Sequence, residues 1–135
     1  MINVFYCWQS DLPTYENREF IKSVLKNIQI ELKKSDIEII IDEATNDMVG
    51  SPKINQEILS KIQNADIFIS DVSIINVSEF GRKVPNPNLM YELGFAVSSL
   101  GWDRVILVFN EKYGNMQDLL FDLEKHRMTI YDSNL

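Results

Sequence analysis

One carboxylate in this sequence stands among residues that a protein normally buries. Glu92 lies in the stretch NPNLMYELGFAVSSLG, residues 86–101, whose other side chains are mostly apolar. The NPN segment predicts a turn with Asn88 as the helix N-cap, which would place Glu92 in the first turn, where the helix dipole favours a negative charge. Gly94 suggests close approach to a neighbouring element, with Leu93 packed inward. A helix-entry charge and a catalytic carboxylate are both open interpretations of Glu92.

Two further acids stand where predicted strands end. Asp71 closes the run DIFISD, and Asp42 closes IEIIID. An acid at the carboxyl end of a strand can anchor the loop that follows, or it can bind sugar hydroxyls. Both roles remain open for Asp71, whereas Asp42 leads into a long polar loop and is interpreted as an anchor.

The segment after the first strand carries Trp8 and Ser10, which could border a ligand. A tryptophan there could stack on a planar ring, although an aromatic at a strand end also serves packing. Asn86 and Asn88 could bind ligand or only shape the turn. Cys7 is interpreted as a small core residue, because no histidine close in sequence could activate it as a nucleophile.

The apolar pattern predicts strands that alternate with helices. Short β-prone runs predict strands at residues 2–7, 37–42, 66–73, 104–110 and 127–132. Apolar spacing predicts helices at 16–34, 51–65 and after residue 88, and a short one at 116–125. This alternation predicts an α/β fold of three layers, with a five-stranded parallel sheet between helices. The nearly unbroken apolar run 37–42 suggests a strand that is covered on both faces.

The predicted topology brings three polar loops to one edge of the sheet. Ligands of such sheets bind at the carboxyl ends of the strands, where the strand order reverses. The loops WQSD, EATNDMVGSP and DVSIINVSEFGRKVPNPN should therefore line a common cleft. No linker or repeat divides residues 1–135, so one domain is expected. Its end directly after the last strand suggests either a piece excised from a longer protein or a partner that covers this edge of the sheet.

Composition argues against several classes of function. The formal charge is -7 and no stretch concentrates Lys or Arg, which disfavours a nucleic-acid partner. One cysteine, Cys7, and one histidine, His126, offer no soft-ligand set for zinc, so no metal is expected. No leader or membrane-length apolar run stands out, which favours a cytoplasmic domain. The glycine-rich fingerprints of dinucleotide and phosphate loops are also missing.

Taken together, several segments resemble one family. VFYCWQSD, GSPKINQEILSKIQNADIFISDVS, NPNLMYELGFAVSSLGWDRVILVFN and DLLFDLEKHRMTIYD are similar, in this order, to the bacterial TIR-like domains of anti-phage defence effectors. The resemblance covers about Ile2 to Asp132. It implies a flavodoxin-like fold and cleavage of NAD+ between nicotinamide and ribose, with Glu92 as the catalytic residue. NAD+ would be the substrate, and no separate cofactor is expected.

The resemblance also implies how the site works and how it is controlled. Nicotinamide leaves as a neutral group, so the demanding event is positive charge on the ribose, which one carboxylate can stabilise. Trp8 and Ser10 would border the nicotinamide or its ribose, and Asp71 and Asn88 would support the pocket. Assembly into a homo-oligomer or filament, driven by a fused cyclic-nucleotide sensor, would activate the enzyme through movement of the loop EATNDMVGSP.

Two alternatives remain. A nucleoside 2-deoxyribosyltransferase has a related fold and uses a helix-opening glutamate as a covalent nucleophile, but it exchanges bases on deoxynucleosides. A TIR adaptor would associate with its own kind and leave NAD+ intact, with Glu92 serving only as a helix-entry charge.

Overall fold

The computed structural model describes residues 1–43, 52–76, 81–119 and 128–134, and its strands in these ranges form one sheet. The order across the sheet is β2-β1-β3-β4-β5, and all four neighbouring pairs are parallel. This is the strand order of flavodoxin-like folds, so the predicted fold class is confirmed. The strands are β1 (Ile2–Cys7), β2 (Ile39–Glu43), β3 (Ile67–Asp71), β4 (Val105–Asn110) and β5 (Met128–Tyr131).

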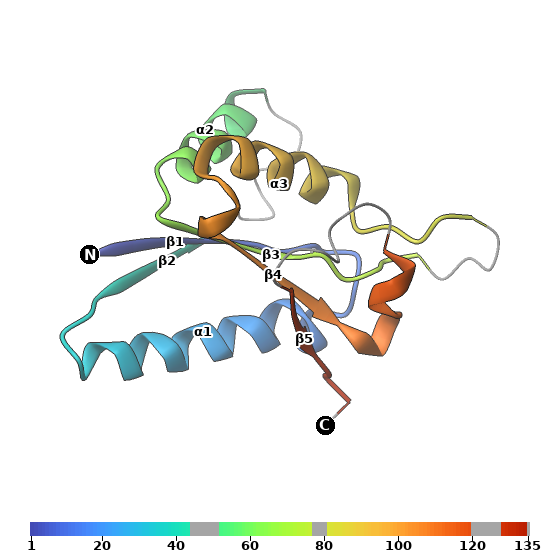
Figure 1. The fold of residues 1–135 in the computed structure, drawn as a ribbon, viewed down its shortest axis with the longest axis horizontal. Helices are drawn as coiled ribbons and strands as arrows, with labels where there is room; N and C mark the ends of the chain where they lie inside the picture. The colour runs from blue at the N-terminus through green and yellow to red at the C-terminus, as the bar shows by residue number, and fades with distance from the viewer. Residues whose placement is uncertain (44–51, 77–80, 120–127, 135) are drawn as a thin grey trace.

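Helices cover both faces of the sheet. Helix α1 (Arg18–Lys33) lies on one face, and α2 (Pro52–Gln63) and α3 (Pro87–Leu100) lie on the other (Figure 1). The predicted three-layer arrangement is therefore present. Four short 3-10 turns complete the described elements: η1 (Thr14–Glu16), η3 (Trp102–Arg104), η4 (Glu111–Tyr113) and η5 (Met116–Asp118).

The alternation of side chains along β1 divides the core into two halves. Phe5 and Cys7 join the cluster under α2 and α3, whereas Val4 and Tyr6 join the cluster against α1. Phe5 stacks on Phe68 of β3 with 5.9 Å between ring centroids. Strand β1 is hydrogen-bonded to β2 on one side and to β3 on the other, which holds its carboxyl end in place. Cys7 is the last residue of β1 and pairs with Ser70 of β3.

The expectation that the second strand is covered on both faces was wrong. Strand β2 is an edge strand, and Ile40 is 44% exposed while Ile39 is 8% exposed. The reason is the placement of the helices: α1 packs against β2 from one side, whereas α3 packs on β3 and β4. An apolar run alone does not distinguish an edge strand from a central one.

Several element boundaries differ from the predicted ones. Helix α1 begins at Arg18 and not at residue 16. Residues 14–16 form the separate turn η1, and Asn17 closes this turn by donating a side-chain hydrogen bond to the carbonyl of Pro13 at 2.8 Å. The short helix expected at 116–125 begins as the 3-10 turn η5, and residues 120–127, including His126, lie outside the described residues. Residues 44–51 of the loop EATNDMVGSP also lie outside them.

None of the helices in the described part of the chain combines the length and the apolar character that a membrane crossing requires.

Candidate active site

Glu92 projects from α3 to the carboxyl end of β1. Its side chain is partly buried, and its Oε2 accepts a hydrogen bond from the Cys7 thiol, with 2.9 Å between Sγ and Oε2. Burial raises the pKa of the Glu92 carboxyl above its usual 4.5, and the bond from Cys7 opposes this rise. The site therefore holds an acid whose proton affinity is tuned by its surroundings, which is typical of functional carboxylates.

Cys7 is 3% exposed, and its pKa is raised well above the usual value by burial first and by the Glu92 charge next. A raised pKa favours the protonated thiol, which donates to Glu92 and is a poor nucleophile in that form. Its contact with Glu92 was not predicted. The period of two along β1 places Cys7 on the same face as Phe5, but only the sheet register and the position of α3 show that this face lies toward Glu92.

Helix α3 begins differently from the prediction. Asn86, not Asn88, is the N-cap: its Oδ1 accepts from the backbone N–H groups of Asn88 at 2.7 Å and Leu89 at 3.3 Å, and Pro87 takes the first helical position. Glu92 then lies beyond the first turn, which contains no acid. Because the dipole effect fades after one turn, a helix-entry charge does not account for Glu92.

The expectation for Gly94 was also wrong. Leu93 is buried as predicted, but Gly94 is exposed, and a Cβ placed there would meet nothing within 4 Å. One helical position after a buried residue, the chain has turned about 100° toward solvent, so Gly94 makes no close approach within the described structure.

A buried glutamine ties the start of α3 to two loops. Gln9 is 4% exposed; its Nε2 donates to the carbonyl of Ser73 at 2.6 Å, and its Oε1 accepts from the backbone of Asn86 at 2.9 Å. The Asn86 side chain adds a bond to Asp11 at 2.7 Å. The sequence analysis did not single out Gln9, although it did single out the loop WQSD, in which Gln9 follows Trp8. These bonds fix the direction from which α3 presents Glu92.

Replacing the cap residue gives a direct test. We expect Asn86→Ala to lower the free energy of unfolding by about 1 kcal/mol, because two backbone N–H groups lose their acceptor. Asn88→Ala is the matched control and should change it by less than about 0.5 kcal/mol, since Asn88 is exposed. Urea unfolding of both variants measures the difference, and a larger loss in the Asn88 variant would refute the assignment of the cap.

Asp71 is held inside the protein. It is 1% exposed; Oδ1 accepts from the backbone N–H and hydroxyl of Ser73, and Oδ2 accepts from the Tyr131 hydroxyl at 2.7 Å. Ser73 in turn accepts from the backbone N–H of Asn110 at 2.8 Å. Burial raises the pKa of Asp71, and the bonds from Ser73 and Tyr131 counter that rise. These contacts match the anchor interpretation, since they connect β3, β4 and β5 at their carboxyl ends.

Of the other predicted site residues, Asn88 lies one helical turn before Glu92 on α3, and Trp8 and Ser10 lie in the segment after β1. Trp8 packs against the core cluster on the α1 side, with the guanidinium carbon of Arg18 3.9 Å from the ring centroid. Ser10 is exposed in a turn, and Asn88 is exposed in the first turn of α3. The predicted residues therefore lie near the carboxyl ends of the strands but on different faces of the sheet. Glu92 lies on the face that α3 covers, and Trp8 lies on the face that α1 covers.

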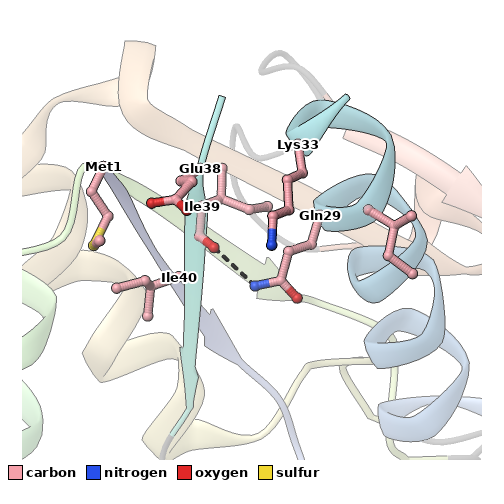
Figure 2. Close-up of a pocket in the computed structure, with 7 residues that line it drawn as sticks. Met1, Gln29, Lys33, Glu38, Ile39 and Ile40 are labelled. Carbon is pink, nitrogen blue, oxygen red and sulfur yellow. Dashed lines mark hydrogen bonds between the residues drawn. The ribbon is translucent and has the colours of Figure 1, made fainter. Parts of the chain in front are cut away.

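A pocket lies at the opposite edge of the sheet (Figure 2). It is found at the amino ends of β1 and β2, where the Gln29 side chain donates to the carbonyl of Ile39 at 2.8 Å. Because β1 runs from this pocket toward Cys7, the two sites stand at opposite ends of the strand. The lining residues are Met1, Gln29, Ile30, Lys33, Glu38, Ile39 and Ile40.

In the described part of the chain, no three His, Cys, Asp or Glu side chains gather closely enough to hold a metal ion.

Comparison with models of known protein families gives no match. Among solved structures, the chain is similar to a 2-deoxyribosyltransferase from Leishmania mexicana, with 17% identity and a TM-score of 0.48 over 82% of this chain and 64% of that one. It is also similar to a CMP N-glycosidase from Clostridium botulinum, with 18% identity and a TM-score of 0.46 over 96% and 88% of the two chains. Similarity at this level carries no conclusion about activity, and the resemblance to TIR-like domains stays a prediction.

Proposed function

We propose that this protein cleaves the N-glycosidic bond of a nucleoside or nucleotide, with Glu92 as the carboxylate at the reacting sugar. The observation that carries the proposal is the partly buried Glu92, held beside the carboxyl end of β1 by Cys7. In this strand order, the loops after β1 and β3 flank the position where ligands bind. A negative charge there can stabilise the cationic sugar that forms when the bond breaks.

NAD+ is the substrate that we propose first, on the basis of the sequence resemblance. The bond between ribose C1′ and the nicotinamide nitrogen breaks, and its electron pair leaves with the ring, which becomes neutral. Water then adds at C1′ and loses a proton to give ADP-ribose, or a nucleophilic atom of the ADP-ribose itself adds there and loses a proton to give a cyclic form. This reaction needs no acid at the leaving group, so the single carboxylate of Glu92 is sufficient. Activation by assembly under a cyclic-nucleotide sensor, in cytoplasmic anti-phage defence, belongs to the same proposal.

Deoxyribosyl transfer is the second candidate, and one observation favours it. Within the described residues, Cys7 donates to Oε2 of Glu92, whereas no donor reaches Oε1. One carboxylate oxygen is thus held while the other is open to attack C1′. The bond from C1′ to the first base breaks, the base leaves with its electron pair and takes a proton from solvent, and a covalent glycosyl ester of Glu92 remains. A second base could then displace Glu92 from the sugar.

A substrate panel separates the candidates. Purified protein is incubated at increasing concentration, with and without a crowding agent, with NAD+, with CMP, or with a deoxynucleoside plus a free base, and products are followed by chromatography. Release of nicotinamide would support NAD+ as the substrate. Release of cytosine would instead indicate a nucleoside monophosphate as the substrate, and base exchange would support deoxyribosyl transfer. If folded and assembled protein cleaves none of them, the adaptor reading replaces the enzyme.

A further inference from the structure

We propose that Cys7 is a positioning residue, whose thiol holds one oxygen of Glu92 and keeps the carboxylate ionised at the sugar; this role rests on the function proposed above. The two side chains come from positions 85 residues apart, one on β1 and one on α3, and meet at 2.9 Å. Cys7 is a protonated donor and Glu92 the acceptor, so the contact has a defined direction.

The two partners differ in freedom. Cys7 lies in a strand that is paired with β2 and β3, directly opposite Ser70, and is 3% exposed. Glu92 is only partly buried, and its side chain has three rotatable bonds. A hydrogen bond from the fixed strand therefore restricts the rotation of the Glu92 carboxylate. The entropy cost of ordering this side chain arises when the protein folds, so it does not add to the barrier of the reaction.

The contact also acts on charge. A hydrogen bond donated to a carboxylate favours its ionised form, so Cys7 lowers the pKa of Glu92 while burial raises it. The negative charge of Asp71, at the end of β3, further disfavours a thiolate at Cys7. On α2, β4 and η3, as far as the structure describes them, no titratable group acts on the Glu92 carboxyl. Cys7 is thus the group in the described structure that favours the ionised form.

A purely space-filling cysteine would behave differently. Ala and Ser have nearly the same volume, and only Ser can replace the thiol donor. If Cys7 only filled space, Ser would be the more harmful substitution, because it would place a hydroxyl in an apolar cluster. If Cys7 positions Glu92, Ser should preserve what Ala removes.

The first test does not depend on activity. The carboxyl carbon of Glu92 is titrated by NMR in glutamate-labelled protein, with Glu92→Gln used to assign its signal, in the wild type, Cys7→Ser and Cys7→Ala. We expect the pKa of Glu92 to be higher in Cys7→Ala than in the wild type and to return toward the wild-type value in Cys7→Ser. Cys7→Val, which fills the space without a donor, should behave like Cys7→Ala and replaces it if that variant does not fold. Equal titrations in the wild type and the donor-free variants would overturn the proposal.

The second test uses the substrate that the panel identifies. In Cys7→Ala, we expect the acid limb of the kcat/KM profile to move to higher pH and kcat/KM on that limb to fall by roughly three- to tenfold, chiefly through kcat. Cys7→Ser should recover most of the loss. An unchanged profile in a folded donor-free variant would overturn the positioning role. A shifted titration in a protein that cleaves no substrate would support the contact but overturn the proposed function, so the two failures are distinguishable.

Discussion

Glu92→Gln should lower kcat/KM for the proposed N-glycoside cleavage by about 10²- to 10³-fold. The amide has the shape of the carboxylate and can still accept the bond from Cys7, but it carries no charge to stabilise the cationic sugar. The loss should appear in kcat more than in KM, because the charge develops only as the bond breaks. Steady-state kinetics with the substrate identified by the panel measures this change.

The same substitution should stabilise the protein at neutral pH. Burial raises the pKa of Glu92, so the folded state binds its proton more tightly than the unfolded state, and ionisation costs folding free energy. That cost is absent below the usual pKa of 4.5 and grows as the pH rises through the folded value. Glu92→Gln removes it, and we expect the melting temperature to increase at neutral pH and the gain to vanish below the usual pKa of 4.5.

Glu57→Gln is the matched control, because Glu57 is an exposed glutamate on the neighbouring helix α2. The same chemical change there should alter neither kinetics nor melting temperature. Loss of stability in Glu92→Gln across the whole pH range would show that the carboxylate is a structural group, and would remove the main support for its catalytic role. Lost activity with gained stability is the pattern expected where function requires a destabilising charge.

Most of the fold could be predicted, because its elements have strong local signals. The run INVFYC predicted β1 with the bounds that the structure shows, since β-prone residues are followed at once by polar loop residues. The exposure of Ile40 could not be predicted, because an edge position depends on which helix crosses which face. The local sequence pattern therefore predicts where a strand or helix lies in the chain. Which elements pack against it depends on segments that are distant in the sequence.

The candidate site shows the same limit. Glu92 stood out because a carboxylate in an apolar helix is unusual, but its partner Cys7 could be found only with the sheet register and the position of α3 in hand. The sequence pattern places the cap two residues late, because Asn86 and Asn88 are equally good capping residues in isolation. Pro87 was the deciding signal, since proline favours the first helical position and so assigns the cap to the residue before it.

Asp71→Ala should be the most destabilising substitution at the carboxyl edge of the sheet. It removes the acceptor of three donors, namely the backbone N–H and hydroxyl of Ser73 and the hydroxyl of Tyr131. Each buried donor without a partner costs about 1 to 3 kcal/mol, and Tyr131 has a second, longer contact with Asn17 at 3.3 Å. We therefore expect the free energy of unfolding to fall by about 3 kcal/mol in a urea titration.

Asp71→Asn separates the two roles that the sequence left open for this acid. Its amide oxygen can accept from Ser73 and its amide nitrogen can donate to Tyr131, so a loop anchor should tolerate it within about 1 kcal/mol. Because burial raises the pKa of Asp71, ionisation disfavours the folded wild type as the pH rises from the usual 3.8 through the folded value, and the stability of the wild type relative to Asp71→Asn should decline over that range. An anchor predicts that Asp71→Asn keeps its activity. A folded Asp71→Asn protein without activity would instead make Asp71 a sugar ligand, because the substitution keeps an acceptor for Ser73, reverses the bond with Tyr131 and removes the charge.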